Sequence, residues 1–231
     1  MHAIAATLKP RKSPVQARSA ATIDMLHTAA IQVLTREGLS RCTTTRIAER
    51  AGISVGSLYQ YYPNRDALLA AILEKHLDGV AGAVEHACGE HRGKPVSQMA
   101  SALVTAFLAA KLRDPGKSKA LYAVAEERGG AALVARLRTR IVAAVATMLA
   151  SAPDARFDDP AMTATVALGA LVGPVEALLE GYVPAEFGAS LEGELVLLLT
   201  AYLQTHQLRP WSPGKPTAIT GRRRISSDTV A

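Results

Sequence analysis

The sequence is poor in aromatic residues and in cysteine. Tryptophan, tyrosine and phenylalanine make up only 4% of its 231 residues, and the two cysteines are Cys42 and Cys88. Two widely separated cysteines cannot build a disulfide framework and lack the spacing of a metal site. We therefore expect reduced thiols, no metal and no cofactor.

Long hydrophobic runs are also lacking, although 49% of the residues are hydrophobic and the chain is long enough to bury a full core. The longest run, LVLLLTAYL at 195–203, has about half of the roughly 20 residues that a membrane-spanning helix requires. The N-terminal segment places its apolar residues before its basic residues, the reverse of a secretory signal. These features predict a cytoplasmic protein with no membrane partner.

Motifs of catalysis are missing from the sequence. The six histidines form no HExxH pattern, and His86 and His91 are five residues apart, which is not the spacing of a ligand pair on one helical face. Neither a glycine-rich phosphate loop nor a nucleophile elbow is found. We therefore predict that the protein is not an enzyme.

The charge is present but unevenly distributed. Residues 1–66 contain nine basic and four acidic residues, whereas residues 67–208 contain twelve basic and fifteen acidic residues. Residues 209–231 are basic again, with five basic residues and one acidic residue. Basic ends favour a polyanionic partner for the ends alone. For the three arginines at 222–224, a solvated tail is the simpler interpretation.

Apolar residues recur at helical spacing along most of the chain. In residues 16–38 they fall on one helical face, and Gly38 suits the C-terminal cap. Asn64 can cap a long helix over 65–87, and Pro63 is expected to end the short tyrosine-rich helix before it. Further helices are predicted at 95–112, 117–127, 130–151, 160–181 and 188–207. No alternating strand pattern remains, so we predict an all-α fold.

Residues 43–62 satisfy the demands of a helix-turn-helix. A short helix with a threonine N-cap comes first, Ala48 is small where two helices would cross, and Gly52 tolerates the positive φ of a sharp turn. The shared core of the two helices is expected to consist of Ile47, Ile53 and Leu58. From the spacing alone, an ordinary helical corner is the alternative interpretation.

The segment TTTRIAERAGISVGSLYQYYPNRDALL resembles the DNA-binding segment of TetR-family transcriptional regulators. The shared pattern comprises Ile47-Ala48, Ala51-Gly52-Ile53, Ser57-Leu58-Tyr59, Tyr62 and Arg65-Asp66-Ala67-Leu68. With the helix before it, the resemblance covers about residues 16–75. Two residues depart from the family's pattern. Arg65 replaces the usual lysine and keeps its charge, and Tyr62 replaces the usual phenylalanine and adds a hydroxyl that needs water or a partner within the chain.

The resemblance implies a homodimer of two-domain chains that binds double-stranded operator DNA. We expect an N-terminal three-helix helix-turn-helix domain at 16–62 and a larger helical effector-binding and dimerisation domain at 63–208. Residues 1–15 are predicted to be a flexible basic arm, either in a minor groove or without contact, and residues 209–231 a disordered basic tail.

DNA contacts are predicted on both helices of the motif and at the start of the next helix. Four of the residues lie on the first exposed turns of the second helix, which enters the major groove in a helix-turn-helix. The resemblance places two tyrosines at the DNA backbone or groove, and two threonines and an arginine lie at helix N-termini that suit phosphate. The predicted DNA-binding residues are Thr43, Thr44, Val55, Gly56, Ser57, Tyr59, Gln60, Tyr61 and Arg65.

The remaining helices are expected to bind a small apolar or amphipathic effector within residues 95–181. Candidate residues of the effector pocket are Leu103, Phe107, Tyr122, Glu126, Met148 and Glu176. The last two predicted helices are strongly apolar, with an apolar face through Leu191, Leu195, Leu198, Leu199 and Tyr202 on the last one. Packing in the core alone would explain this composition, whereas the resemblance makes the two helices the dimer bundle.

These features together predict a sequence-specific transcriptional regulator. We expect a repressor that a small molecule releases from a palindromic operator, with coupling through the helix that starts after Asn64. A helical carrier of apolar ligands, or a scaffold without specific DNA binding, is the alternative.

Overall fold

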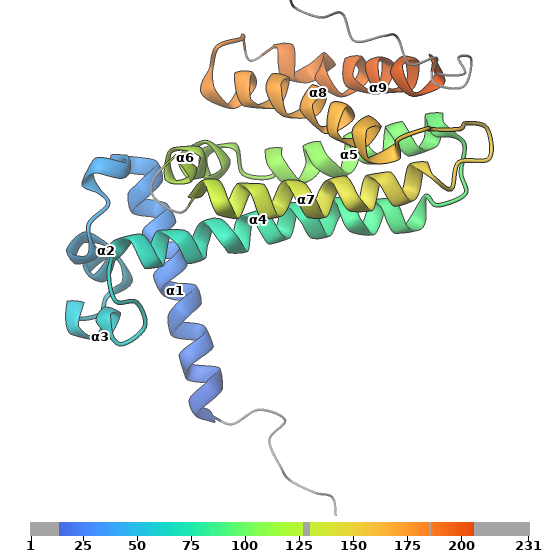
Figure 1. The fold of residues 1–231 in the computed structure, drawn as a ribbon. Helices are drawn as coiled ribbons and strands as arrows, with labels where there is room; N and C mark the ends of the chain where they lie inside the picture. Colours follow the sequence, from blue (N-terminus) through green and yellow to red (C-terminus); the bar gives the residue numbers. More distant parts are fainter. Residues whose placement is uncertain (1–13, 127–129, 185, 206–231) are drawn as a thin grey trace, which may run out of the picture.

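The computed structural model describes residues 14–126, 130–184 and 186–205. Within these ranges all regular elements are helical, which confirms the predicted all-α fold (Figure 1). The helices are α1 (Pro14–Glu37), the 3-10 turn η1 (Leu39–Arg41), α2 (Thr44–Ala51), α3 (Val55–Tyr59), α4 (Arg65–Glu90), α5 (Val96–Leu112), α6 (Pro115–Ala125), α7 (Gly130–Leu149), α8 (Pro160–Glu180) and α9 (Phe187–Thr205).

Local capping explains where several of these helices begin and end. The Thr43 side chain accepts a hydrogen bond from the backbone N–H of Arg46 and so caps α2, which ends at Gly52 with φ +70°. The Asn64 side chain accepts from the backbone N–H of Ala67 at 2.8 Å and caps α4. The predicted roles of the threonine, the glycine and the asparagine are therefore confirmed.

The prediction that Pro63 ends the tyrosine-rich helix is wrong. Helix α3 already ends at Tyr59, because the amides of Gln60 and Tyr61 donate to carbonyl oxygens only three residues back, those of Ser57 and Leu58, at 3.3 and 2.9 Å. The chain thus leaves the helix in a turn that precedes the proline. Pro63 lies in the connection between this turn and Asn64.

Other boundaries differ from the predicted ones by a few residues. Helix α6 begins at Pro115 because the Asp114 side chain accepts from the Lys117 amide at 2.9 Å. Helix α1 begins at Pro14, inside the predicted basic arm, and the turn η1 was not predicted. The rest of that arm, the predicted tail at 209–231 and residues 127 and 206–207 of two predicted helices lie outside the described residues.

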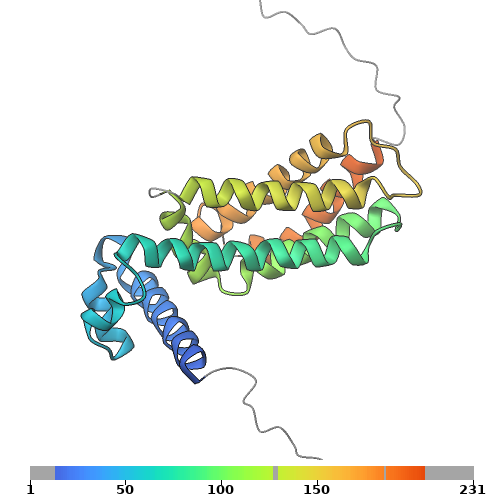
Figure 2. The same cartoon turned by 60° about the horizontal axis from the view of Figure 1, so that its bottom comes forward.

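The helices form two groups that share α4. Helices α1, α2 and α3 gather at the N-terminal end of α4, and α5 to α9 pack along and above the rest of it (Figure 1). Helices α4 and α7 run side by side over most of their length (Figure 2). Because α4 belongs to both groups, it connects them physically.

Helix α8 is the one described helix that is long and apolar enough, by length and composition alone, to cross a membrane. Its buried side includes Ala164, Leu168 and Leu171, and the helix packs against α7 and α9. The hydrophobic core thus accounts for the apolar residues on this side of α8. Core helices of globular proteins are apolar for the same reason.

Candidate nucleic-acid interface and effector cavity

The corner formed by α2 and α3 has a small hydrophobic core of its own. Ile47, Ala48 and Leu58 are almost completely buried, and Ile53 in the turn is half-buried against them. Gly52, with its positive φ, lets the chain reverse between the two helices. The structure therefore contains the helix-turn-helix corner that the spacing of these residues predicts.

The outer face of this corner presents several of the predicted DNA-binding residues. Tyr59 is half exposed, and its hydroxyl oxygen lies 3.4 Å from the hydroxyl oxygen of Thr44, so the start of α2 and the end of α3 form one polar surface. Gly56, Gln60 and Thr43 are also exposed. These three residues and Tyr59 are accessible to a macromolecular partner, and Thr44 is half-buried beside them.

Three other predicted residues of this site are less accessible. Val55 and Tyr61 are half-buried and pack against the hydrophobic core. Ser57 is half-buried, its hydroxyl lies 2.8 Å from the hydroxyl of Ser54, and its backbone N–H donates to the same Ser54 oxygen. Ser57 therefore takes part in the N-terminal cap of α3, while Tyr61 helps to fix the turn after it.

Arg65 lies at the start of α4 and is engaged within the chain. Its Nε donates to the carboxylate of Asp66 at 2.9 Å, and Nη1 donates to the carbonyl oxygen of Leu39 at 3.5 Å. The side chain is still about one third exposed. Arg65 thus connects α4 to η1 and keeps part of its guanidinium at the surface.

Two contacts fasten α1 to the segment that follows the corner. The Nε2 atom of His27 lies 2.7 Å from the Tyr62 hydroxyl, which is the partner that this extra hydroxyl required. Burial lowers the pKa of His27 and raises that of Tyr62. On the surface, Lys75 of α4 donates to Asp24 of α1 at 2.8 Å, and this hydrogen bond lowers the pKa of Asp24. His27 was not predicted from the sequence, although it lies on the inward face of α1.

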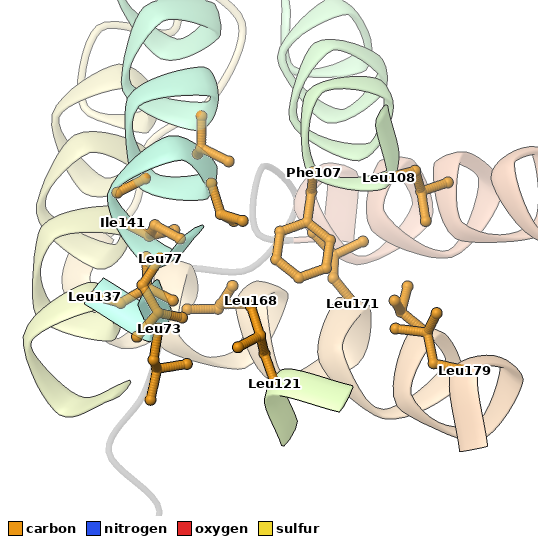
Figure 3. Close-up of a cluster of buried hydrophobic side chains, with 14 of the residues drawn as sticks. Leu73, Leu77, Phe107, Leu108, Leu121, Leu137, Ile141, Leu168, Leu171 and Leu179 are labelled. Atoms are coloured by element: carbon orange, nitrogen blue, oxygen red, sulfur yellow. The ribbon is translucent and has the colours of Figure 1, made fainter. Parts of the chain in front are cut away.

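A cavity of about 80 Å³ lies in the larger group of helices, lined by residues of α4, α5, α6, α7 and α8. Most of its wall is aliphatic or aromatic. Figure 3 shows the Phe107 side chain directed from α5 toward Leu168 and Leu171 of α8, near Leu121 of α6. Of these four side chains, all but Leu171 line the cavity.

Two of the six predicted effector residues, Phe107 and Tyr122, line this cavity. Leu103 and Met148 are buried elsewhere in the core, and Glu126 and Glu176 are exposed residues that do not line it. Helix α4 contributes Leu73, His76 and Leu77, so the cavity extends beyond the predicted range of 95–181. The predicted range omitted α4 because the α4 residues come close to those of α5 to α8 only when the chain is folded.

Polar groups of the cavity were also missed from the sequence. Lys111 is 7% exposed, and its Nζ lies 4.8 Å from the centroid of the Tyr122 ring. Burial lowers the pKa of Lys111 and raises the pKa of Tyr122 to about 12. The sequence does indicate the position of Lys111, because this residue follows Phe107 by four residues and therefore shares its helical face.

His76 is the second polar group that the sequence analysis missed. Burial lowers its pKa to about 4, with a smaller contribution from the nearby positive charge of Lys111. Its Nε2 has no hydrogen-bond partner within the described part of the chain. His76 follows Leu73 by three residues and precedes Val80 by four, so its helical spacing also placed it on a buried face.

Helices α8 and α9 also expose large apolar side chains. Met162 and Val166 of α8 are 60% and 46% exposed, and Leu197 and Leu198 of α9 are 65% and 50% exposed. Four residues of the predicted dimer face do not lie on this surface. Leu191, Leu195 and Leu199 are buried within the chain, and Tyr202 is half-buried.

Comparison with known proteins assigns the chain to a family. Residues 26–72 match the family model described as bacterial regulatory proteins of the tetR family, and residues 95–203 match the tetracyclin repressor-like C-terminal domain. Together the two matches cover more than half of the chain. The protein belongs to the TetR family of DNA-binding transcriptional regulators, which are not enzymes, so both of these predictions are confirmed.

Among curated proteins, the chain is similar to nucleoid occlusion factor SlmA. It is 29% identical to SlmA of Actinobacillus pleuropneumoniae over 116 residues, which cover 50% of this chain and 54% of that protein. With SlmA of Haemophilus ducreyi, the identity is 33% over 69 residues, or 29% of this chain and 32% of that protein. The chain thus spans about half the length, or less, of these curated relatives.

Solved structures share the fold at low sequence identity. A putative TetR-family regulator from Mesorhizobium loti has a TM-score of 0.65 at 18% identity, covering 81% of this chain and 98% of that one. The fatty acid degradation regulator FadR from Bacillus halodurans has a TM-score of 0.61 at 17% identity, covering 77% and 97%. FadR from Bacillus subtilis, solved in complex with stearoyl-CoA, has a TM-score of 0.64 at 13% identity, covering 78% and 98%.

Proposed function

We propose that this regulator is a homodimeric repressor of a near-palindromic operator and that a small apolar or amphipathic effector in the cavity releases it. One observation carries the proposal. Lys75 and His76 are neighbours on α4, yet Lys75 is bonded to Asp24 of α1, whereas His76 lines the cavity. A shift of α4 on ligand binding therefore acts directly on the support of the helix-turn-helix.

For the DNA contact, we propose that α3 enters the major groove. Gly56 and Gln60 are exposed near its ends, so the backbone can approach the DNA closely at Gly56 and Gln60 can bond to a base edge. Thr43, Thr44 and Tyr59 contact phosphates on one side of this helix, and Arg65 does so at the start of α4. Ser57, Val55 and Tyr61 keep α3 and its exit in place, and their outer atoms add to the contact. The DNA-binding domain extends to residue 62 in this proposal.

The homodimer is supported by the exposed apolar residues of α8 and α9. Gly169 and Gly173 lie on the outside of α8, and no other atom lies within 4 Å of a Cβ built on either of them, so a second helix can approach closely there. Large exposed apolar patches commonly mark protein interfaces. A two-fold dimer presents two equal recognition helices, so the half-site centres lie about 34–36 Å apart, or a multiple of it.

The nature of the effector is supported by the wall of the cavity, which is mostly apolar. The similarly folded FadR of Bacillus subtilis was solved with stearoyl-CoA, a ligand with a long apolar chain. The effector shifts DNA binding only by its preference for the conformation that does not bind DNA, typically about 5- to 150-fold. A cytoplasmic location, where the DNA is, belongs to the same proposal.

The test begins with selection of a preferred site from random duplex DNA, followed by footprinting and sedimentation of the purified full chain. We expect protection of an inverted repeat and a dimer at micromolar concentration. A monomer would contradict the dimer. Binding that is abolished by salt and indifferent to sequence would instead favour the carrier or scaffold. Titration of a cavity ligand with and without the operator tests release, because the operator must weaken ligand binding by the same factor.

A further inference from the structure

The charged residues that line the cavity are, within the described part of the chain, of one sign. Lys111 and Arg138 line it together with the neutral side chain of His76, whereas no aspartate or glutamate of the described residues does. Among the described residues, no carboxylate oxygen lies within 4.0 Å of the Lys111 Nζ atom, so none forms a salt bridge with it. Glu176 acts on Lys111 only from a greater distance.

The position of Lys111 is energetically unfavourable without a partner. Transferring an ammonium group from water into an apolar environment costs several kcal/mol unless an anion or hydrogen-bond acceptors compensate. Its described contact is with the face of the Tyr122 ring, and a cation–π contact offsets only part of this cost. Leu73, Leu77 and Leu137 belong to the apolar part of the same wall. The cavity therefore combines one deep cationic group with an apolar interior.

We propose that the effector is an apolar molecule with one carboxylate, which pairs with the ammonium of Lys111 while its hydrocarbon body fills the aliphatic part of the cavity. This inference rests on the proposed function, because it identifies the chemical class of ligand for the same cavity. The Lys111 ammonium donates charge-assisted hydrogen bonds to the carboxylate oxygens. Arg138 is exposed at the cavity wall and attracts the anion to it.

The size of the cavity limits the hydrocarbon body. A volume of about 80 Å³ accommodates roughly six water-sized groups, since one such group needs about 10–15 Å³. Because the exposed residue Arg138 belongs to the wall, the cavity reaches the surface, and a carboxylic acid of roughly six to eight carbons can fill it and extend its remaining atoms there. Octanoate and octan-1-ol form a matched pair, because they have the same chain and differ in the charge of the head group.

Calorimetric titration of the full chain with octanoate and with octan-1-ol tests the proposal. We expect octanoate to bind the wild-type protein at least about tenfold more tightly than octan-1-ol, because a hydrogen-bonded charge pair is worth about that factor. The variant Lys111→Met keeps the length and apolar stem of the side chain, and it should remove this preference. Lys111→Arg should restore part of it, and Lys94→Met, at an exposed lysine, should leave it unchanged.

Three results would overturn the proposal: equal affinities of the wild-type protein for the two probes, a preference that persists in Lys111→Met, or no saturable binding of octanoate. Footprinting of the same protein samples separates this from the proposed function. If octan-1-ol relieves operator protection and octanoate does not, the proposed repressor function stands and the charged effector is refuted. Binding of octanoate through Lys111 without any operator protection would support the charged ligand and refute the repressor.

Discussion

The helix-turn-helix and the effector cavity differ in the sequence separation of the residues that form them. In the corner of α2 and α3, the buried residues Ile47 and Leu58 are separated by a single turn. The cavity, in contrast, collects side chains from Leu73 in α4 to Val172 in α8. A DNA-binding corner can thus be specified by a short local pattern, whereas the shape and charge of a ligand cavity depend on the packing of five helices.

The two regions also use buried histidines differently. His27, next to the helix-turn-helix, is bonded to the Tyr62 hydroxyl at 2.7 Å. His76, in the cavity, has an Nε2 atom without a partner among the residues described. Buried polar groups without partners are costly and are concentrated at functional sites in native proteins. The Nδ1 atom of His27 is likewise without a partner, so the two histidines differ in the bond to Tyr62, which fixes α1 to the segment that follows the corner.

The largest expected effect comes from a substitution in the small core of the helix-turn-helix, which should impair DNA binding and leave the cavity intact. Leu58→Ala removes a completely buried side chain from the small core of the corner and should lower the free energy of unfolding by about 2–5 kcal/mol. DNA affinity should fall strongly, while octanoate binding in the cavity should stay within about twofold of wild type. Urea unfolding and the two binding assays measure this. Equal losses of both activities would mean that the regions do not behave separately.

A second prediction concerns acid stability and the unpaired histidine of the cavity. The folded-state pKa of His76 is about 4, below the ordinary value of 6.5, so the unfolded chain binds more protons between these values. The contribution of His76 to stability is therefore complete above about pH 6.5 and declines as the pH falls toward 4. Between pH 7 and pH 4.5, the free energy of unfolding should therefore fall by roughly 2 kcal/mol less in His76→Gln than in the wild-type protein.

Urea unfolding at several pH values measures this difference, and the carboxylates titrate alike in both proteins, so their contribution cancels. Parallel pH profiles for His76→Gln and wild type would show that His76 is not buried as a neutral group. His27 has a pKa that burial also lowers, so His27→Gln at the other end of the molecule is the matched comparison. If acid sensitivity belonged to the corner alone, only His27→Gln would change the profile.

The difference in sequence separation also explains how much of each region could be predicted from the sequence. Thr43, Gly52 and Asn64 act through hydrogen bonds or backbone angles within a few residues, so their types and spacing were sufficient to predict capping and the turn. Tyr62 was expected to need a partner, but its partner His27 is 35 residues away and was not found. The contact forms through packing of α1 against the corner, which no local pattern specifies.

In the cavity, the sequence identified the aromatic wall and missed the cation. Phe107 and Tyr122 were predicted together with Leu103 and Met148, as large side chains of the middle helices. Glu126 and Glu176 were chosen as polar residues near them, but they face outward in the structure. Which polar residue turns inward depends on where α5 and α6 cross, so helical spacing relative to Phe107 was the only local signal for Lys111.

A third prediction tests the hydrogen bond between the corner and α1. Tyr62→Phe introduces the residue usual for the family and leaves the Nε2 atom of buried His27 without its partner. We expect a loss of about 1 kcal/mol in the free energy of unfolding, measured by urea at pH 7. Tyr59→Phe is the control, because its hydroxyl is exposed and lies 3.4 Å from that of Thr44. A loss in Tyr59→Phe as large as in Tyr62→Phe would refute this account.

The smallest expected effect concerns the charge at the start of α4 and sharpens the contrast between general and specific DNA contacts. Arg65 contacts a phosphate in our proposal, so Arg65→Ala should weaken binding to all sequences alike. Removal of one phosphate contact should change the slope of log affinity against log salt concentration by about 0.9. Gln60→Ala should instead alter base preference and leave this slope unchanged, which fluorescence anisotropy on several duplexes can measure.

The control for Arg65 has to separate its charge from its structural contacts. Arg65 is bonded to Asp66 and to the Leu39 carbonyl, so Arg65→Ala also loosens the junction of α4 with η1. Arg65→Lys keeps the charge, and lysine is usual at this position in the family, so it should retain the wild-type salt slope even if its stability falls slightly. A reduced slope in Arg65→Lys would assign the effect to the junction. A changed base preference in Arg65→Ala, with the slope unaltered, would move Arg65 from the phosphate contacts to the contacts that read the DNA sequence.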